Sequence, residues 1–192
     1  MSTDRLFQVL SSMQPLSEEF KIALEKDLIP FTLPKNYILL DPPRVSEYVY
    51  FLDNGFAMSY SFFDGRKITE SFWQSGQIMV AFESFFEQQP SLEAIQLMTK
   101  SDVLCISYVS VQRMFESFPE AQKLYRAIMN HEYADSRRRI RDMQRLNALQ
   151  RYEKLLVTYP DIELIVPQDS IASYLGIAAQ SLSRLKRTRP HS

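Results

Sequence analysis

The sequence predicts an α+β protein with three consecutive parts: an antiparallel β-roll of jelly-roll type, one long helix, and a C-terminal pair of short helices. Short apolar or alternating runs separated by turn residues occupy positions 31–108. Several short strands about ten residues apart are typical of a small antiparallel barrel or jelly roll. A helical apolar period then continues to about residue 146, and a glycine divides the helical segment that follows Gln168.

Composition bounds the class of protein. The 192 residues allow one domain or two small ones, and 45% hydrophobic with 23% charged residues exclude a disordered tail or a collagen-like repeat. The single cysteine excludes a disulfide framework and a four-thiolate metal site. No apolar run reaches the roughly 18 residues of a membrane span, and residues 1–10 lack a signal-peptide pattern. We therefore expect no membrane partner and a cytoplasmic location.

The first thirty residues are expected to be helical. Leu6, Val9, Leu10 and Met13 share one helix face, and Ser17 is placed to begin a second short helix. Strands are then expected at 37–40, 48–52, 56–63, 68–73, 95–98 and 103–108. Asn54-Gly55 and Asp64-Gly65 can each supply the positive φ angles of a tight hairpin, so both pairs are predicted as hairpin turns.

Pro119 suits the first turn of the long helix, because its missing N–H would be unpaired there. Steps of three and four residues along this helix form a seam typical of coiled coils: Tyr125, Met129, Tyr133, Ser136, Ile140 and Met143. A second apolar stripe, with Leu124, Ile128 and His131, lies beside it. One stripe can pack on the roll and the seam on a second copy of the chain, which favours a homodimer. A single wide core-facing stripe is the alternative.

The C-terminal segment has the spacing of a helix-turn-helix. Another helix is expected over 147–159, followed by a short helix whose inner face carries Ile171, Ala172 and Leu175. Gly176 can end this helix in the left-handed conformation, and a second helix then buries Leu182 and Leu185. A generic helical hairpin would show a similar pattern, so the outward face has to decide between them.

That outward face is cationic and free of acidic residues. Residues 137–192 contain eleven Lys and Arg against five Asp and Glu, a net charge of +6, which leaves −7 for residues 1–136. Gln and Arg side chains can read base edges, whereas Ser, Lys and Arg suit phosphates. The sequence therefore predicts that this helix binds double-stranded DNA. The residues expected to contact bases are Gln180, Ser183 and Arg184. The residues expected to contact phosphates are Ser181, Lys186 and Arg187. A solvated cationic helix end is the alternative.

At this point the chain resembles the cyclic-AMP receptor protein and fumarate–nitrate regulator (Crp/Fnr) superfamily. The resemblance includes Gly55, the segment 76–107, Phe118-Pro119 and the segment 170–187. It is similar to short members of the superfamily of Bacteroidetes type, which contain a motif like Ala81-Phe82-Glu83-Ser84-Phe85 of this chain. The resemblance implies a homodimeric transcription regulator of palindromic DNA, with RNA polymerase as a further partner. Its implied domains are a cyclic-nucleotide-binding-like sensor roll (1–118), a dimerisation helix (119–146) and a helix-turn-helix domain (147–192).

The sequence departs from the superfamily where cyclic nucleotides bind. A Gly-Glu pair and an Arg-Ser/Thr pair cradle the ribose and phosphate there, and Val80-Ala81 and Ser91-Leu92 take their places. We therefore expect no binding of cyclic AMP in the usual mode. Either an unidentified small-molecule effector binds, or Phe82, Phe85 and Phe86 fill the space. The candidate effector pocket comprises Val80, Ala81, Phe82, Glu83, Ser91, Leu92 and Ser136.

The helix-turn-helix departs from the superfamily as well. Ala179 and Gln180 replace Arg and Glu at the first exposed positions, which predicts a different target sequence. Ala178 replaces the usual Ser/Thr cap, at a cost of about 1 kcal/mol. The printed sequence stops at Ser192, so a helix-turn-helix without a full wing is expected.

Other candidate sites carry less weight. Cys105 is expected to be a buried thiol, and His131 and His191 lack the spacing of a metal site. Glu83 lies in the apolar stretch 78–86 without a partner carboxylate, and no catalytic constellation can be assembled, so an enzyme is not expected. No cofactor or metal is predicted. The rival function is a small-ligand-binding or protein-interaction module whose DNA-binding end is degenerate.

Overall fold

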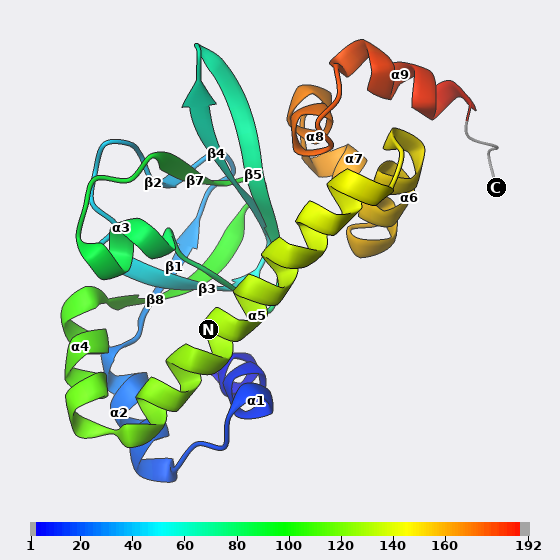
Figure 1. The fold of residues 1–192 in the computed structure, drawn as a ribbon. Helices are drawn as coiled ribbons and strands as arrows, with labels where there is room; N and C mark the ends of the chain where they lie inside the picture. The colour runs from blue at the N-terminus through cyan, green and yellow to red at the C-terminus, as the bar shows by residue number, and fades with distance from the viewer. Residues whose placement is uncertain (1–2, 189–192) are drawn as a thin grey trace.

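The computed structural model describes residues 3–188, and it has the predicted α+β order (Figure 1). Eight strands form two four-stranded antiparallel sheets, ordered β1-β8-β3-β6 and β2-β7-β4-β5. The strands are β1 (Ile29–Leu33), β2 (Ile38–Leu40), β3 (Tyr48–Asn54), β4 (Phe56–Phe63), β5 (Arg66–Gln74), β6 (Gln77–Met79), β7 (Glu93–Leu97) and β8 (Ser101–Ser107). The helices are α1 (Asp4–Met13), α2 (Glu18–Asp27), α3 (Phe82–Glu87), α4 (Tyr108–Ser117), α5 (Pro119–Arg145), α6 (Ala148–Thr158), α7 (Ile162–Ile165), α8 (Gln168–Tyr174) and α9 (Ala179–Thr188).

The core of the roll lies between the two sheets. Leu52 and Val103 come from one sheet, Ala57 and Leu97 from the other, and all four are fully buried in one cluster. All six expected strands are present, whereas β1, β6 and the short helix α3 were not expected. No helix within residues 3–188 is both long enough and apolar enough to cross a membrane.

The two predicted hairpin turns differ in outcome. Asp64 and Gly65 have φ angles of 50° and 70° and join the directly paired strands β4 and β5, as a two-residue hairpin requires. The prediction of a hairpin at Asn54-Gly55 is wrong, because β3 pairs with β6 and β8 while β4 pairs with β5 and β7. Gly55, with φ of 126°, instead turns the chain from one sheet into the other.

The helices α1, α2 and α4 pack with the first half of α5 beneath the roll (Figure 1). Ser17 caps α2 as expected, since its hydroxyl accepts a hydrogen bond from the backbone N–H of Phe20 at 3.1 Å. The Glu120 carboxylate in the first turn of α5 accepts hydrogen bonds from the Ser17 N–H and hydroxyl, both at 2.8 Å. This joint ties the start of α2 to the start of α5.

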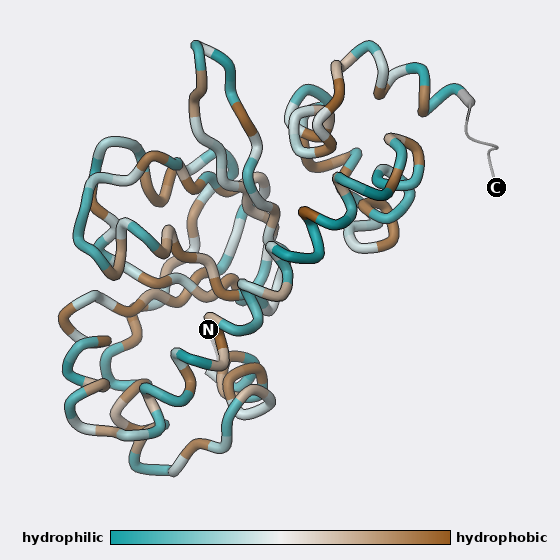
Figure 2. The backbone as a smooth tube through the Cα atoms, in the orientation of Figure 1, coloured by the Kyte–Doolittle hydropathy of each residue, from teal (hydrophilic) through white to brown (hydrophobic). Residues whose placement is uncertain are grey.

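The long helix α5 begins at Pro119, as predicted, and ends at Arg145 because a new helix starts immediately afterwards. Asn147 and Gln150 form a reciprocal capping box at the start of α6. The second half of α5 leads from the roll to the terminal helices (Figure 1), and Figure 2 shows this stretch to be largely hydrophilic. The long helix therefore connects the two main bodies of the molecule.

Candidate nucleic-acid interface and candidate effector site

The terminal helices α8 and α9 form the predicted helix-turn-helix. Ile171, Leu175 and Leu182 are at most 2% exposed and pack in one cluster, which also contains Ala172. Gly176 has a φ of 67° and follows α8, in agreement with its expected role as a helix stop. The two short helices therefore meet across Gly176.

The guanidinium of Arg151 in α6 holds the turn of this motif. It donates to the carbonyl oxygen of Leu175 at 2.9 and 3.2 Å and to that of Leu146 at 2.7 Å. Carbonyl groups at helix ends have no partner within the helix, so a guanidinium there satisfies two of them at once. The turn thus has a fixed position relative to the end of α5.

The outward face of α9 consists of Gln180, Ser181, Arg184 and Arg187, and all four are exposed. Residues 180, 184 and 187 recur at helical spacing, and α9 contains no acidic residue. Arg184 lies at the surface rather than in the interior. Figure 1 shows α9 at one end of the molecule, and the exposed face of this helix is polar and cationic.

Two residues that were predicted to face DNA instead have partners inside the motif. The side-chain amide of Gln168 in α8 donates to the hydroxyl of Ser183. The Lys186 ammonium forms an ion pair of 2.6 Å with the Glu163 carboxylate of α7. These contacts brace α9 against α7 and α8, so Ser183 and Lys186 point toward the sides of the helix rather than outward.

The predicted effector pocket does not come together as a set. Val80, Ala81 and Ser91 are buried, Phe82 is half-buried, and the others are exposed, namely Glu83, Leu92 and Ser136. The hydroxyl of Ser91 serves its own turn, because it accepts from the backbone N–H of Glu93 at 3.1 Å and donates to that residue's carbonyl at 2.7 Å. Glu83, which lies in an apolar stretch of the sequence, is exposed on α3.

The phenylalanines of α3 pack among other aromatic rings. Phe85 is fully buried, with its ring centroid 5.0 Å from that of Phe86 and 5.4 Å from that of Tyr108. Phe86 lies 4.7 Å from Tyr125 of α5. Tyr125, predicted as part of a dimer seam, therefore has aromatic partners within its own chain.

The interior of the roll contains a polar cluster that the sequence analysis missed. Ser59 and Ser61 of β4 alternate on the face that also carries Ala57 of the core, and Ser61 pairs in register with Glu93 of β7. The Ser61 hydroxyl donates to the Glu70 carboxylate of β5 at 2.7 Å. Two carboxylates thus share this face, which we call the acidic cluster (Ser59, Ser61, Glu70 and Glu93).

Burial raises the pKa of Glu93 above its ordinary value. The neighbouring Glu70 carboxylate raises it further, whereas the nearby Ser59 hydroxyl, which lies outside normal hydrogen-bond geometry, lowers it. None of the ion pairs formed by residues 3–188 includes Glu70 or Glu93. The two carboxyl groups of the acidic cluster therefore have no cationic partner among these ion pairs, and burial disfavours the charged form of Glu93.

The outer side of β5 is the docking surface for the terminal helices. Tyr174 of α8 packs on Phe72, with ring centroids 4.7 Å apart, and the Tyr159 hydroxyl donates to the Phe72 carbonyl at 3.0 Å. The Ser173 hydroxyl accepts from the Thr69 N–H at 3.0 Å. Strand β5 therefore touches the acidic cluster on one side and the helix-turn-helix on the other.

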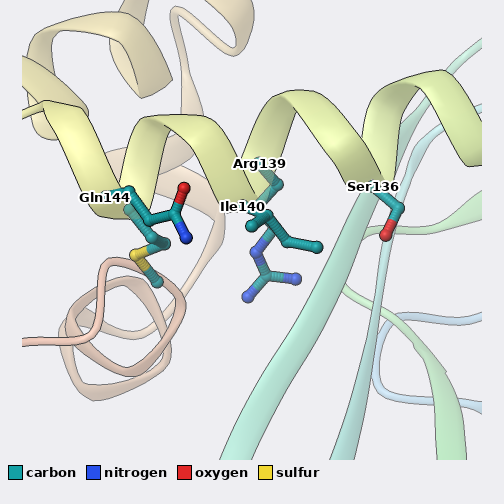
Figure 3. Close-up of a pocket in the computed structure, with 5 residues that line it drawn as sticks. Ser136, Arg139, Ile140 and Gln144 are labelled. Atoms are coloured by element: carbon teal, nitrogen blue, oxygen red, sulfur yellow. The ribbon is translucent and has the colours of Figure 1, made fainter.

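The seam predicted along α5 remains partly uncovered. Tyr133 is 67% exposed, Ile140 44% and Met143 39%, and Ser136 is exposed as well. A surface depression of about 330 Å³ is lined by Ser136, Arg139, Ile140, Met143 and Gln144. Figure 3 shows Ser136, Arg139, Ile140 and Gln144 along the second half of α5. In the other predicted stripe, Leu124 and Ile128 pack inward as expected, whereas His131 is exposed.

The remaining candidates agree with structural roles. Cys105 is buried in β8, and burial raises the pKa of its thiol to about 11, so it is a poor nucleophile at neutral pH. His131 is exposed on α5 near Asp135, with 3.9 Å between ring nitrogen and carboxylate. Residues 3–188 contain no group of three or more side chains able to hold a metal ion. His191 and the expected lack of a wing fall outside the described residues.

No protein-family model matches the sequence, and no curated protein matches it either. Solved structures do match. A protein from Eubacterium rectale assigned to the Crp/Fnr family of transcriptional regulators shares 17% identity with a TM-score of 0.73, over 90% of this chain and 82% of that one. FixK2 from Bradyrhizobium japonicum shares 20% identity, with a TM-score of 0.68 and 83% coverage of each chain. The c-di-GMP-responsive regulator CLP from Xanthomonas campestris shares 16% identity, with a TM-score of 0.68 over 89% and 90%.

The chain has the fold of the Crp/Fnr regulators. This confirms the predicted arrangement of an antiparallel roll followed by helices. The Crp/Fnr fold places the acidic cluster inside the roll and the cationic face of α9 at the far end of the chain, with α5 and β5 between them. TM-scores of 0.68–0.73 establish this common fold, whereas identities of 16–20% say nothing about the ligand or the target of this chain.

Proposed function

We propose that the protein is a DNA-binding transcription regulator that acts as a homodimer. The observation that carries this proposal is the outward face of α9, the second of two crossed helices. Gln180, Ser181, Arg184 and Arg187 are exposed there, and α9 itself contains no acidic residue. A helix about 10–12 Å across fits the major groove of B-DNA. The Crp/Fnr fold supports the same function, because the Eubacterium rectale protein of this fold is assigned to a family of transcriptional regulators.

The roles of the α9 residues follow from their positions. Gln180 and Arg184 lie one helical turn apart on the exposed face, so they can reach neighbouring base edges, Gln to adenine and Arg to guanine. Ser181 and Arg187 flank them and suit phosphates. Lys186 and Ser183 are positioning residues, since their contacts with Glu163 and Gln168 fix the orientation of α9. This division differs from the sequence prediction in that Ser183 no longer contacts a base and Lys186 no longer contacts a phosphate.

Duplex DNA binding by the full chain tests the proposal. Retention on random duplex should fall steeply as salt rises, because Lys and Arg release counterions from phosphates. On a site selected from a random pool, Arg184→Ala should lower affinity by about 1–3 kcal/mol and relax selectivity at one base pair. Arg126→Ala removes the same charge from an exposed position on the roll half of α5 and should have little effect.

Absence of duplex binding at low salt would contradict the regulator. It would favour the rival function, a small-ligand-binding or protein-interaction module with a degenerate DNA end. Equal losses for Arg184→Ala and Arg126→Ala on selected and random DNA would show that binding is a property of overall charge. In that case the base-reading role of Arg184 would be wrong.

The dimer seam is proposed to run from Met129 through Tyr133, Ser136 and Ile140 to Met143. Tyr133, Ile140 and Met143 form an exposed apolar stripe on α5. The same stripe on the α5 of a second copy can bury it in a self-complementary interface. Two copies of α9 would then have to sit about 34–36 Å apart to meet successive major grooves. The proposed domains of this dimer are the sensor roll (1–118), the dimerisation helix (119–146) and the helix-turn-helix domain (147–192).

Ile140→Glu is expected to convert the dimer into a monomer, because it places two carboxylates at the centre of an apolar seam. Sedimentation or light scattering of the full chain measures this mass directly. Val157→Glu is the matched control, since Val157 is 82% exposed on α6 and lies away from the seam. A wild-type monomer, or a dimer that tolerates Ile140→Glu, would overturn the seam.

A further inference from the structure

The acidic cluster has the wrong charge for a phosphate ligand. Its two carboxylates come from neighbouring positions on the inner face of one sheet: Glu93 lies opposite Ser61, and Ser61 donates to Glu70 at 2.7 Å. Two cations beside this part of β5 lie against aromatic rings: Lys67 lies over the Tyr60 ring and Arg139 over the Tyr174 ring. Within residues 3–188 no ion pair includes Glu70 or Glu93, so the cluster presents hydrogen-bond acceptors without a paired cation.

A buried hydroxyl without a partner lies in the same cluster. Ser59 is fully buried, and its Oγ has no hydrogen-bond partner of normal geometry among residues 3–188. It lies two residues before Ser61 on the same face of β4 and close enough to Glu93 to influence that carboxylate. A buried polar group without a partner costs free energy, so a ligand able to contact it would recover that cost.

We propose that the acidic cluster is the effector site of the roll and that its ligand is a small organic cation, an amine or guanidine, held by Glu70 and Glu93. An ammonium or guanidinium group supplies only donors, and two carboxylates flanked by serine hydroxyls supply acceptors for them. This identification rests on the proposed function, because it assigns the signal to which the regulator would respond.

Other ligand classes fit this cluster less well. A phosphate would meet two carboxylates and no cation, which like-charge repulsion opposes. A metal ion would find two carboxylates where at least three ligand side chains are usual, and no such group exists within residues 3–188. A neutral apolar ligand would leave both carboxylates dehydrated without compensation.

Glu70 also connects this cluster with the terminal helices. It is the extra residue of a β-bulge, because the register between β4 and β5 shifts between Ser59 and Tyr60. Its carboxylate faces the cluster, while its backbone carbonyl accepts from the Arg139 guanidinium of α5. The adjacent Thr69 N–H donates to Ser173 of α8. A cation that binds the Glu70 carboxylate therefore acts on a residue that contacts α5 directly and on its neighbour Thr69, which contacts α8.

The test is calorimetric titration of the full chain near neutral pH with putrescine and agmatine as cationic probes. Equally small 1,4-butanediol serves as the neutral control and cyclic AMP as the anionic one. We expect saturable binding of at least one cationic probe and neither control. Glu93→Gln and Glu70→Gln should each weaken that binding at least about tenfold, since a charge-assisted hydrogen bond is lost. Glu87→Gln, an exposed change on α3, should leave it unaltered.

Stability measurements separate loss of the site from loss of the fold. Burial raises the pKa of Glu93, so its ionisation opposes folding and stability should fall as pH rises above the ordinary carboxyl pKa. Glu93→Gln cannot ionise and should unfold at the same or a higher temperature than the wild type at neutral pH. Weaker probe binding by a variant of undiminished stability then supports the site.

Several results would overturn the inference. These are a dissociation constant weaker than about 1 mM for both cationic probes, equal binding of the diol, or binding that survives Glu93→Gln and Glu70→Gln. The DNA experiments have their own outcome. Probe binding without duplex binding would support the cation site and contradict the proposed regulator. Duplex binding without probe binding would support the regulator and contradict the cation site.

Discussion

Replacement of Phe72 by alanine is expected to cost about 3–5 kcal/mol of unfolding free energy and to free the terminal helices from the roll. The Phe72 ring is 4% exposed, and three aromatic rings surround it. Its centroid lies 4.7 Å from that of Tyr174, and 6.0 Å from those of Phe56 and Tyr159. The cavity left by alanine would open on the surface where β5 supports α8, so the loss should fall on the contact between the two bodies.

Denaturant titration of the full chain with two probes measures this effect. Trp73, the single tryptophan, packs against the roll core beside Phe72 and reports on the roll, while far-ultraviolet circular dichroism reports mainly on the helices. The two transitions should coincide in the wild type and separate in Phe72→Ala. Phe63→Ala is the matched control, because Phe63 is 76% exposed near the tip of the β4–β5 hairpin. Similar behaviour of the two variants would refute the interface.

The sequence predicts those parts of the fold that depend on neighbouring residues. Asp64-Gly65 joins two strands that pair with each other, so local turn chemistry suffices to predict the hairpin. Asn54-Gly55 carries a similar signal, yet its flanking strands enter different sheets, and this depends on pairings with β6, β7 and β8 far along the chain. The helix α3 was missed because its phenylalanines also suit a strand.

In the candidate DNA interface, too, some features follow from neighbouring residues and others depend on tertiary structure. The burial of Leu182 and the exposure of Arg184 follow from helical periodicity within α9. The partners of Ser183 and Lys186 come from α8 and α7, so their inward roles depend on how three helices cross. Periodicity alone assigned both residues to the outward face, because it assigns a face without revealing what lies beside it.

The acidic cluster depends most strongly on tertiary structure. Glu70 and Glu93 meet because β4 lies between β5 and β7 in the sheet, and a bulge turns Glu70 toward Ser61. The usable signal in the sequence is weak: two serines alternating inside an otherwise apolar strand, at positions where a core-facing side chain is expected. Polar residues at core positions of a strand are a reason to look for a site.

Gly55→Ala is expected to be the more damaging of two glycine replacements and to cost about 2–6 kcal/mol of stability. A Cβ atom on Gly55 would lie 2.1 Å from Ser101 Oγ and 3.1 Å from the backbone Cα of Ser101, and the φ of 126° is itself unfavourable for alanine. Ser101 is the first residue of β8, so relief of the overlap has to move the strand between β1 and β3.

Gly65→Ala isolates the backbone part of this cost. Gly65 also has a positive φ, 70°, but no atom lies within 4 Å of a Cβ placed there, so only the left-handed conformation is penalised, by about 1–2 kcal/mol. Chemical denaturation of both variants, followed through Trp73, gives the difference. A Gly55→Ala protein no less stable than Gly65→Ala would mean that the passage from β3 to β4 can relax. The close approach of Gly55 to β8 would then not fix how the two sheets of the roll are joined.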